Sequence, residues 1–592
     1  MELDREQKLA AEAQEKRILV VSAAGSGKTR TLTARISYLI NEKKVSAYEI
    51  FTGTFTRAAA NNMKERLEPL IGTSAVNHLT IGTFHGIALG LLHRFGDQLG
   101  LKPKSLTIYS QFEENYLLKD VAIELGAFKK SWKIPKKDID EVFGNYYGRG
   151  ELPKEIHPAH DLFNAFIVRM RENNSLSYGA LLVGFKILIP IISKYLNWRY
   201  VLVDEVQDHS EYMWDITNDL CKFFNASLFA VGDVSQSLYQ WRMASPEYLI
   251  NHQNEFKIYN LSTNYRSVPK IVKSANVLIE NNTMRLPLTM KPFRESDSDQ
   301  SIKVHRGMNS AVCVQFIKAL LMDEKPEDIA VLCRIHAPLK KLSKLLDEAG
   351  IEHAYIGKKS DLTGSEEFRR VHSFLKLIIN PFDNFSYLML VNLIGISRSE
   401  YQDIRIKAAE IGQSHFQVWM SGYNNAFTEF FRTAGDNSLA ALAFAIKYMA
   451  TGAVPFPSEG WEFDVEPSFQ FIFSWLKDNP NGTIREYLDF LAVFDLQDEV
   501  AENDKKLMLS SVHGFKGLER KIIILAGVNE GILPSKQAIK SNDTESERRL
   551  MYVAVTRAED KLILAVRPEQ KLTESGKILE NPKSRFIEEM KL

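Results

Sequence analysis

The segment SAAGSGKT, from Ser22 to Thr29, ends in Gly-Lys-Thr and has the residue types that bind a nucleotide phosphate. It follows RILVVSA (17–23), an apolar run typical of a strand buried in a parallel sheet, and precedes a helical pattern over 29–40. Glycines let backbone N–H groups approach the phosphates, Lys28 reaches the β- and γ-phosphates, and Thr29 can ligate Mg²⁺. Ser22 replaces the first glycine of the general pattern, but the context favours a phosphate-binding loop over a chance turn. Its candidate nucleotide-binding residues are Ala24, Gly25, Ser26, Gly27, Lys28 and Thr29.

Two adjacent carboxylates, Asp204 and Glu205, follow the apolar run YVLV (200–203). In a nucleotide-binding α/β lobe, the carboxyl ends of the strands face the nucleotide. We therefore expect Asp204 to hold Mg²⁺ through water and Glu205 to polarise the attacking water. An acidic pair after a strand is by itself more often a solvated strand end, so this prediction depends on the phosphate loop.

Two arginines gain meaning from their sequence context in the second half of the chain. Arg266 lies in NYRS and Arg557 lies in YVAVTRA. Hydrolysis of a γ-phosphate needs positive charge where negative charge builds up, and an arginine supplied by the same chain can provide it. A site divided between two lobes would couple the nucleotide state to lobe closure, which is the physical basis of a motor.

Aromatic and hydroxyl side chains occur together in three expected loops, GTFT (53–56), GTFH (82–85) and SLYQWR (237–242). Aromatic faces stack on unpaired bases without reading sequence, while hydroxyl and backbone N–H groups donate hydrogen bonds to the phosphates. Core packing is an equally weighted alternative for Phe55 and Phe84, and a weaker one for Tyr239 and Trp241. The candidate contacts to single-stranded nucleic acid are Phe55, Thr56, Thr83, Phe84, His85, Tyr239, Trp241 and Arg242.

Strands that alternate with helices must position these residues, and this pattern predicts an α/β fold with parallel sheets. Further strands are expected at 50–56 and 227–233, and a second α/β lobe is expected from about 261, with strands at 329–333, 507–511 and 522–526. Each lobe is interrupted by a mainly helical, aromatic insertion. The expected domains are lobe 1A at 1–85 and 176–260, insertion 1B at 86–175, lobe 2A at 261–384 and 502–592, and insertion 2B at 385–501.

Composition narrows the class of protein. The 592 residues suggest roughly four domain-sized units, and 45% hydrophobic with 25% charged residues exclude a disordered, collagen-like or coiled-coil chain. The 74 basic residues balance the 74 acidic ones, so nucleic acid would have to bind in a local groove. The three cysteines form no C-x-x-C pair, which excludes a disulfide framework and predicts the reducing cytoplasm. The apolar run 178–196 carries Lys186 and Pro190, so we expect a buried helix and no membrane partner.

Taken in order, the motifs resemble those of the UvrD/Rep/PcrA family of superfamily 1 DNA helicases. The resemblance extends from Leu3 to about Glu589. It implies two RecA-like lobes with P-loop NTPase chemistry, ATP and Mg²⁺ as cofactors, and 3′→5′ translocation on single-stranded DNA with unwinding at single-strand/duplex junctions. The matching segments are LDREQKLAA (3–11), SAAGSGKTR (22–30), TFTRAAANNM (54–63), VDEVQD (203–208), VGDVSQSLYQWR (231–242), LSTNYRS (261–267), SSVHGFKGLE (510–519) and ESERRLMYVAVTRAED (545–560).

The resemblance also implies roles for single residues. Gln7 would read adenine, Tyr265 would stack on it, and Arg30 would lie near the base. Glu519 would lie near the ribose, while Gln236 would sense the γ-phosphate. His513 and Lys516 would lie near DNA, and Arg557 would act as a second arginine finger beside Arg266. The implied catalytic set is Lys28, Glu205, Gln236, Arg266 and Arg557.

The chain departs from the family pattern at four places. Ser177–Leu182 replaces an acidic stretch, Arg334–His336 replaces a pattern that ends in Asn, Arg520 replaces an aromatic residue, and 385–501 is short for a 2B insertion. Two alternatives therefore stay open. One is a DNA-sensing subunit that regulates a partner nuclease in repair or antiviral defence; the other is a translocase that strips proteins from single strands without separating duplexes.

Overall fold

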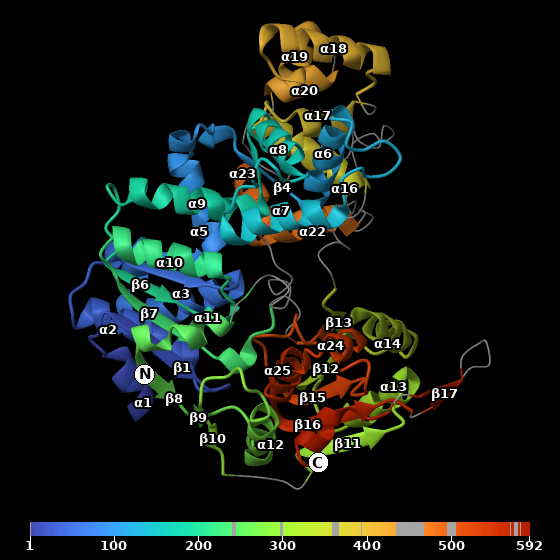
Figure 1. Ribbon diagram of the computed structural model, residues 1–592. Coiled ribbons are helices and arrows are strands. Elements are labelled where there is room, and N and C mark those ends of the chain that lie inside the picture. Colours follow the sequence, from blue (N-terminus) through green and yellow to red (C-terminus); the bar gives the residue numbers. More distant parts are fainter. Residues whose placement is uncertain are drawn as a thin grey trace. The chain divides into compact units, whose positions relative to one another are not determined.

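The computed structural model describes most of the chain, and its residues divide into two compact units (Figure 1). The first unit comprises Met1–Thr83, Ser193–Gly357 and Asp495–Leu592, and the second comprises Phe84–Ile192 and Lys358–Phe494. The described residues are 2–239, 244, 246–295, 300–357, 366–391, 394–424, 426–433, 467–493, 505–568, 570–572, 578–580 and 582–592.

The first unit contains two lobes, and the N-terminal one is built on a six-stranded sheet in the order β3-β2-β6-β7-β1-β8. All its strand pairs are parallel, so their carboxyl ends lie at one edge. Val20, Leu32, Ile36 and Phe229 belong to its core, which explains the nearly continuous apolar runs of β1 and β7. The strands are β1 (Arg17–Ser22), β2 (Ile50–Thr54), β3 (Thr80–Thr83), β6 (Tyr200–Val203), β7 (Ser227–Gly232) and β8 (Lys257–Leu261). The helices are α1 (Arg5–Ala11), α2 (Lys28–Asn41), α3 (Arg57–Ile71), α4 (Thr73–His78), α10 (Glu211–Phe223) and α11 (Pro246–Asn251).

The C-terminal lobe of this unit repeats the plan with a second six-stranded parallel sheet, in the order β11-β16-β15-β12-β14-β13. The predicted α/β fold with two parallel-sheet lobes is thus confirmed. The strands are β11 (Ile302–Arg306), β12 (Ile329–Cys333), β13 (His353–Tyr355), β14 (Leu507–Ser511), β15 (Arg520–Ala526) and β16 (Ala558–Val566), with the short pairs β9 (Thr263–Asn264) with β10 (Lys291–Pro292) and β17 (Gln570–Leu572) with β18 (Ile578–Glu580). The helices are α12 (Pro269–Ile279), α13 (Ser310–Leu320), α14 (His336–Glu348), α24 (Lys536–Ser541), α25 (Thr544–Val555) and α26 (Arg585–Glu589).

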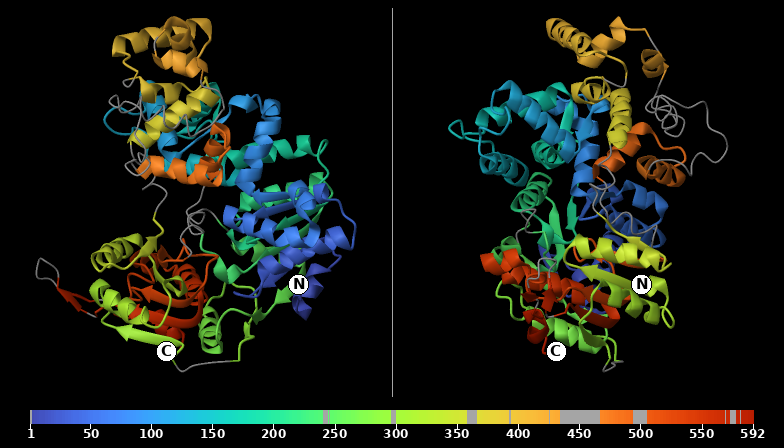
Figure 2. Two further views of the ribbon diagram at one scale, coloured as in Figure 1. Left: turned by 180° about the vertical axis from the view of Figure 1, so that it is seen from behind. Right: turned by 90° about the vertical axis from the view of Figure 1, so that its right-hand side faces the viewer.

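The second unit is mainly helical and comes from two stretches of the chain (Figures 1 and 2). These stretches contain the two expected insertions, and they also contain α9 and α16, which the expected boundaries placed in the lobes. Its first stretch supplies α5 (Phe84–Phe95), α6 (Gln111–Glu124), α7 (Lys136–Arg149), α8 (His160–Glu172) and α9 (Tyr178–Ile192), with the parallel pair β4 (Thr107–Tyr109) and β5 (Ser175–Ser177). Its second stretch supplies α16 (Glu366–Ile379), α17 (Asn384–Leu390), α18 (Arg398–Ile411), α19 (His415–Gly422), α20 (Ala426–Thr433), α22 (Pro467–Asp478) and α23 (Ile484–Val493).

Buried polar contacts join these two stretches inside the second unit. The Asn380 amide donates to the Thr107 hydroxyl at 2.9 Å and to the Asn173 carbonyl at 2.8 Å, and the Tyr109 hydroxyl donates to Asp383. Satisfied polar networks of this kind fix one arrangement of the helices they connect. The two stretches of the second unit therefore share one interior.

The apolar run 178–196 forms α9, whose Leu181, Phe185, Leu188 and Ile192 are fully buried, so the expected buried helix is confirmed. Within the described part of the chain, no helix has the length and apolar character needed to cross a bilayer.

Candidate nucleotide and nucleic-acid site

The phosphate loop lies between β1 and α2 in the N-terminal lobe. Gly25 and Gly27 have φ of +66° and +80°, which glycine adopts without steric cost, and Gly27 caps the 14-residue helix α2. The N–H groups of the first turn of α2 are thus available to an anion. Ser22 ends β1 and donates its hydroxyl to the Gly232 carbonyl at 3.1 Å, which explains the hydroxyl where the general pattern has glycine.

The acidic pair lies at the carboxyl end of β6, as predicted from the sequence. Lys28 Nζ lies 3.0 Å from the Glu205 carboxylate, and the Gln207 amide also donates to that carboxylate. Burial disfavours the charge of Glu205, but the charges of Lys28 and Lys516 outweigh it and lower its pKa. Burial and the charge of Glu205 raise the pKa of Asp204. The arrangement keeps Glu205 ionised, as a residue that polarises water requires.

The oxygen donors around the loop suit a hard divalent cation. Thr29 lies in the first turn of α2, and the buried Asp204 accepts the Glu205 N–H through Oδ1 at 2.9 Å. The raised pKa of Asp204 indicates a carboxylate that needs added positive charge to ionise fully. Carboxylate and hydroxyl oxygens are ligands that Mg²⁺ accepts together with phosphate oxygens. The predicted ligands Thr29 and Asp204 therefore fit Mg²⁺.

The C-terminal lobe brings two arginines to this region. Arg557 is buried at the end of α25, and its Nη2 donates to Gln236 Oε1 at 3.0 Å. Gln236 in turn donates to Asp233 Oδ2 at 2.7 Å, which continues the contact into the N-terminal lobe. Arg266 donates to the Thr556 carbonyl at 2.8 Å and forms an ion pair with Glu519. Arg557 thus contacts Gln236 directly, and Arg266 contacts the backbone of the residue that precedes Arg557. Glu519, which the resemblance places near the ribose, forms an ion pair with Arg266 in this structure.

The N-terminal helix α1 packs against the loop. Gln7 is buried, and its Nε2 donates to the Ser26 carbonyl at 3.0 Å. The Glu6 carboxylate accepts the Ser262 N–H at 2.6 Å, and the Tyr265 hydroxyl donates to Asp4. These contacts place Gln7 and Tyr265 at the loop, while their roles toward adenine, like that of Arg30, stay predictions.

Four of the predicted nucleic-acid contacts form one cluster within the first unit. Phe55 stacks on Tyr239 with ring centroids 4.7 Å apart, and the Tyr239 hydroxyl donates to the His513 carbonyl at 3.4 Å. Lys516 is buried, forms an ion pair with Asp208 and lies 5.1 Å from the centroid of the Tyr239 ring. A DNA contact by Lys516 therefore requires it to leave Asp208.

Three further predicted contacts have structural surroundings of their own. Thr56 caps α3 by accepting the Ala59 N–H at 3.1 Å, and Thr83 ends β3. Phe84 is fully buried, as its alternative interpretation as a core residue requires. Trp241 and Arg242 lie outside the described residues.

The second unit contains a further aromatic candidate, Tyr178, which the sequence patterns did not indicate. Its ring stacks on His85 with centroids 4.1 Å apart and planes 7° apart, and the side chain is 41% exposed. A stacked pair with an exposed face can accept an unpaired base. The available signal was an aromatic residue directly after a short strand, as at Phe55.

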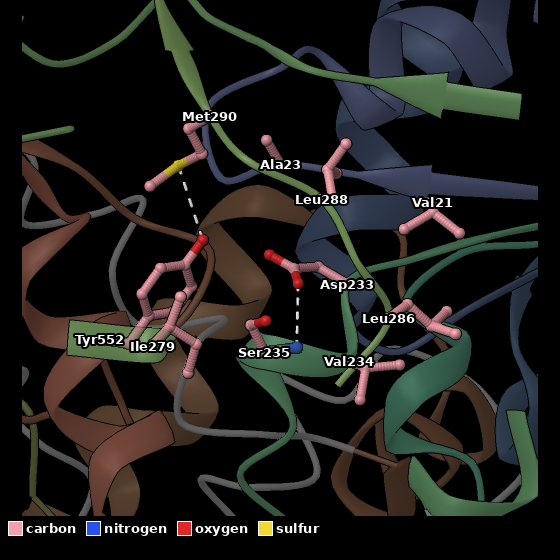
Figure 3. Close-up of a pocket in the computed structure, with 10 residues that line it drawn as sticks. All are labelled: Val21, Ala23, Asp233, Val234, Ser235, Ile279, Leu286, Leu288, Met290 and Tyr552. Carbon is pink, nitrogen blue, oxygen red and sulfur yellow. Dashed lines mark hydrogen bonds between the residues drawn. The ribbon is translucent and has the colours of Figure 1, made fainter. Parts of the chain in front are cut away.

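A small cavity lies behind the phosphate loop, between Ala23, Ser235, Leu288 and Tyr552 (Figure 3). It measures about 10 Å³, which is room for one water molecule and far too little for a nucleotide. Asp233 Oδ1 accepts the Ser235 N–H at 2.9 Å on one wall. This cavity belongs to the interior between the lobes and is not the nucleotide site.

The fold and this site define a two-lobed P-loop protein. The sequence of the chain matches two protein-family models. The UvrD/REP helicase N-terminal domain matches residues 3–257, and the UvrD-like helicase C-terminal domain matches residues 259–438 and 470–568. The chain belongs to the UvrD/Rep helicase family.

Several curated relatives span nearly the whole chain. The ATP-dependent DNA helicase PcrA of Bacillus subtilis is 27% identical over 97% of this chain and 83% of its own length. The PcrA proteins of Staphylococcus aureus and Staphylococcus epidermidis are 26% and 27% identical, each over 99% of this chain and 86% of their own length.

Proposed function

We propose that this protein is an ATP-dependent DNA helicase that moves 3′→5′ along single-stranded DNA and separates duplex at single-strand/duplex junctions. The observation that carries this proposal is the hydrogen bond between Arg557 of the C-terminal lobe and Gln236 of the N-terminal lobe. It joins an arginine finger to a residue beside the phosphate loop, so a γ-phosphate between them can control lobe closure. Family membership and the named activity of the relatives support the choice of DNA.

In the proposed reaction, ATP separates Lys28 from Glu205, because the β- and γ-phosphates attract the lysine more strongly than one carboxylate does. Glu205 then orients the attacking water, and Arg266 and Arg557 stabilise charge on the transferred phosphoryl group. Thr29 and Asp204 would hold Mg²⁺, which supplies positive charge to the phosphates.

The single strand would stack on aromatic side chains, and each unit has its own candidates. In the first unit, the Phe55 ring stacks on Tyr239, whose hydroxyl contacts the His513 carbonyl. In the second unit, the Tyr178 ring stacks on His85. Stacking tolerates any base, as movement along DNA requires. Tyr239 lies three residues after Gln236, so a change at the nucleotide reaches this loop through a short segment.

Glu205→Gln tests the proposal. We expect it to bind ATP and DNA like the wild type but to hydrolyse ATP at least about 100-fold more slowly, since general-base catalysis contributes roughly 10²–10⁴-fold. The measurement is ATP hydrolysis with and without single-stranded DNA, together with unwinding of duplexes that carry a 3′ or a 5′ tail. Near-normal hydrolysis by the variant, or unwinding that needs a 5′ tail, would contradict the proposal.

The wild-type protein in the same assay separates the other candidates. DNA-stimulated hydrolysis without strand separation would favour a protein-stripping translocase or a DNA-sensing subunit of a partner nuclease. We propose the cytoplasm as the compartment, because Cys221, Cys313 and Cys333 are free thiols.

A further inference from the structure

Asn264, at the end of β9, is fully buried although its side chain is polar. Buried amides are stable only when their donors and acceptors are paired, so its partners reveal what it holds in place. Its Nδ2 donates to the Ala24 carbonyl in the phosphate loop at 2.7 Å. Its Oδ1 accepts the N–H groups of Arg266 at 3.1 Å and Ser267 at 2.8 Å.

These partners fix the orientation of the amide. Only the nitrogen can face the Ala24 carbonyl, and only the oxygen can accept two backbone N–H groups. Asn264 therefore connects the phosphate loop directly to the backbone that carries Arg266.

Close backbone packing reinforces this connection. The Tyr265 N–H donates to the Gly25 carbonyl at 3.0 Å. A Cβ on Gly25 would lie 2.9 Å from Arg266 Cβ and 3.0 Å from Asn264 Nδ2, so only glycine allows this approach.

The other side of the same turn is attached to the C-terminal lobe. The Ser267 hydroxyl donates to the Ala558 carbonyl at 2.6 Å, and the Val268 N–H donates to the Glu559 carbonyl at 2.9 Å. Both acceptors directly follow Arg557 in the sequence. Residues 264–268 thus bridge the phosphate loop and the segment that carries the second arginine.

We infer that Asn264 is a positioning residue that sets the place of the Arg266 guanidinium relative to the phosphate loop. The inference deepens the proposed function and rests on it, because it takes Arg266 as a contact of the γ-phosphate. A displacement of about 1 Å in a catalytic group can cost about 10²-fold in rate. In this inference, Asn264 affects the chemical step only through the position of Arg266.

Asn264→Asp is the sharpest test, because it keeps the acceptor for both N–H groups and replaces the donor with an oxygen that faces the Ala24 carbonyl. We expect ATP turnover, as kcat, to fall about 10- to 100-fold, with affinity for a fluorescent ATP analogue within about 3-fold of the wild type. Arg266→Ala and the double variant complete a cycle. If Asn264 acts through Arg266, adding Asn264→Asp to Arg266→Ala lowers kcat by less than about 2-fold further.

Asn174→Asp in the second unit is the matched control. Asn174 also donates to a backbone carbonyl and accepts a backbone N–H, both of Lys102, at 3.0 and 2.8 Å. It controls for the general cost of the same substitution, and we expect its kcat to match the wild type.

Each outcome of the cycle decides a different point. Two results would overturn the inference and leave the proposed function intact. One is a wild-type kcat in Asn264→Asp, and the other is a fold-loss of kcat in the double variant that equals the product of the fold-losses in the two single variants. Wild-type kcat in Arg266→Ala would overturn the role of Arg266 in the proposed function, and the inference with it.

Discussion

The backbone conformation of Glu205 and the contacts of its carboxylate fix the position of this candidate catalytic group. Its backbone lies in the left-handed region, at φ +50° and ψ +42°, which costs a residue with a side chain of the order of 1 kcal/mol or more. Its carboxylate is held by Lys28 and by the amide of Gln207. Gln207 Oε1 accepts the Asp233 N–H at 3.0 Å, so the same buried side chain supports Glu205 and the start of the segment that contains Gln236.

Gly232→Ala tests this support. A Cβ at Gly232 would lie 2.5 Å from Gln207 Oε1 and 2.8 Å from Val206 Cγ2, so Gln207 must move. We expect ATP turnover to fall about 10-fold or more, with nucleotide binding retained, because Glu205 loses one of its two holding contacts. Steady-state ATP hydrolysis and nucleotide titration measure this.

The control for this substitution is Gly144→Ala in α7, where a Cβ would meet no atom within 4 Å. We expect it to be neutral or to stabilise slightly, by up to about 1 kcal/mol, because alanine favours a helix over glycine. Equal ATP turnover in Gly232→Ala and the wild type would show that Glu205 does not depend on Gln207.

Local sequence predicts the ends of strands well. Lys28, Asp204 and Glu205 follow apolar runs, and in a parallel sheet such ends meet at one edge, so their proximity could be foreseen. The pairing of Lys516 with Asp208, 308 positions apart, could not. It depends on how two separately folded sheets face each other, and no spacing within a motif encodes that.

At the scale of elements, helices α6, α7 and α9 of the second unit pack closely near the buried carboxyl group of Glu114. Glu114 of α6 accepts the Tyr147 hydroxyl of α7 at 2.9 Å. Gly179 of α9 leaves room for the Tyr147 ring, because a Cβ there would lie 2.6 Å from its Cγ. Burial raises the pKa of Glu114 to about 7. The replacement of the family's acidic stretch by Ser177–Leu182 therefore coincides with tight packing of Tyr147 on α9.

Glu114 predicts a pH dependence of stability. Its folded pKa of about 7 exceeds the unfolded value, so its protonated form stabilises the fold below the unfolded pKa, and this contribution is lost as the pH rises through 7. Glu114→Gln keeps an acceptor for Tyr147 without the charge. We compare the free energy of unfolding of this variant with that of the wild type. As the pH rises from 4.5 to 8, we expect the difference in favour of the variant to grow by up to about 3 kcal/mol.

Thermal melting of both proteins across this pH range measures the difference. The exposed Glu410→Gln in α18 is the control, and its melting temperature should follow the wild type at every pH. Parallel melting curves for Glu114→Gln and the wild type would show that Glu114 ionises without cost to the fold.

At the scale of the whole molecule, the two lobes of the first unit meet at the residues that we propose bind the nucleotide. Lys516 of the C-terminal lobe contacts Asp208 and donates to the Gln236 carbonyl at 2.8 Å, and Arg557 donates to the Gln236 side chain. Gln236 thus accepts hydrogen bonds from two cationic side chains of the opposite lobe. One is Arg557, which we propose contacts the phosphate, and the other is Lys516, which lies beside Tyr239. A change at either the phosphate or the aromatic loop must alter the same interlobe contact.

Lys516→Met tests this coupling, but the single change leaves the Asp208 carboxylate buried without its partner, which costs about 3–5 kcal/mol. Adding Asp208→Asn removes that charge, so we expect the double variant to recover most of the lost melting temperature. DNA stimulation of ATP hydrolysis should stay at least about 5-fold below the wild type in both variants, because neither restores the link to Gln236.

Lys521→Met, at the half-exposed pair of Lys521 with Asp328, is the control and should change neither the melting temperature nor the DNA stimulation. If the double variant regains full DNA stimulation together with its stability, Lys516 contributes only to folding, and the coupling between DNA and nucleotide does not use its contact with Gln236.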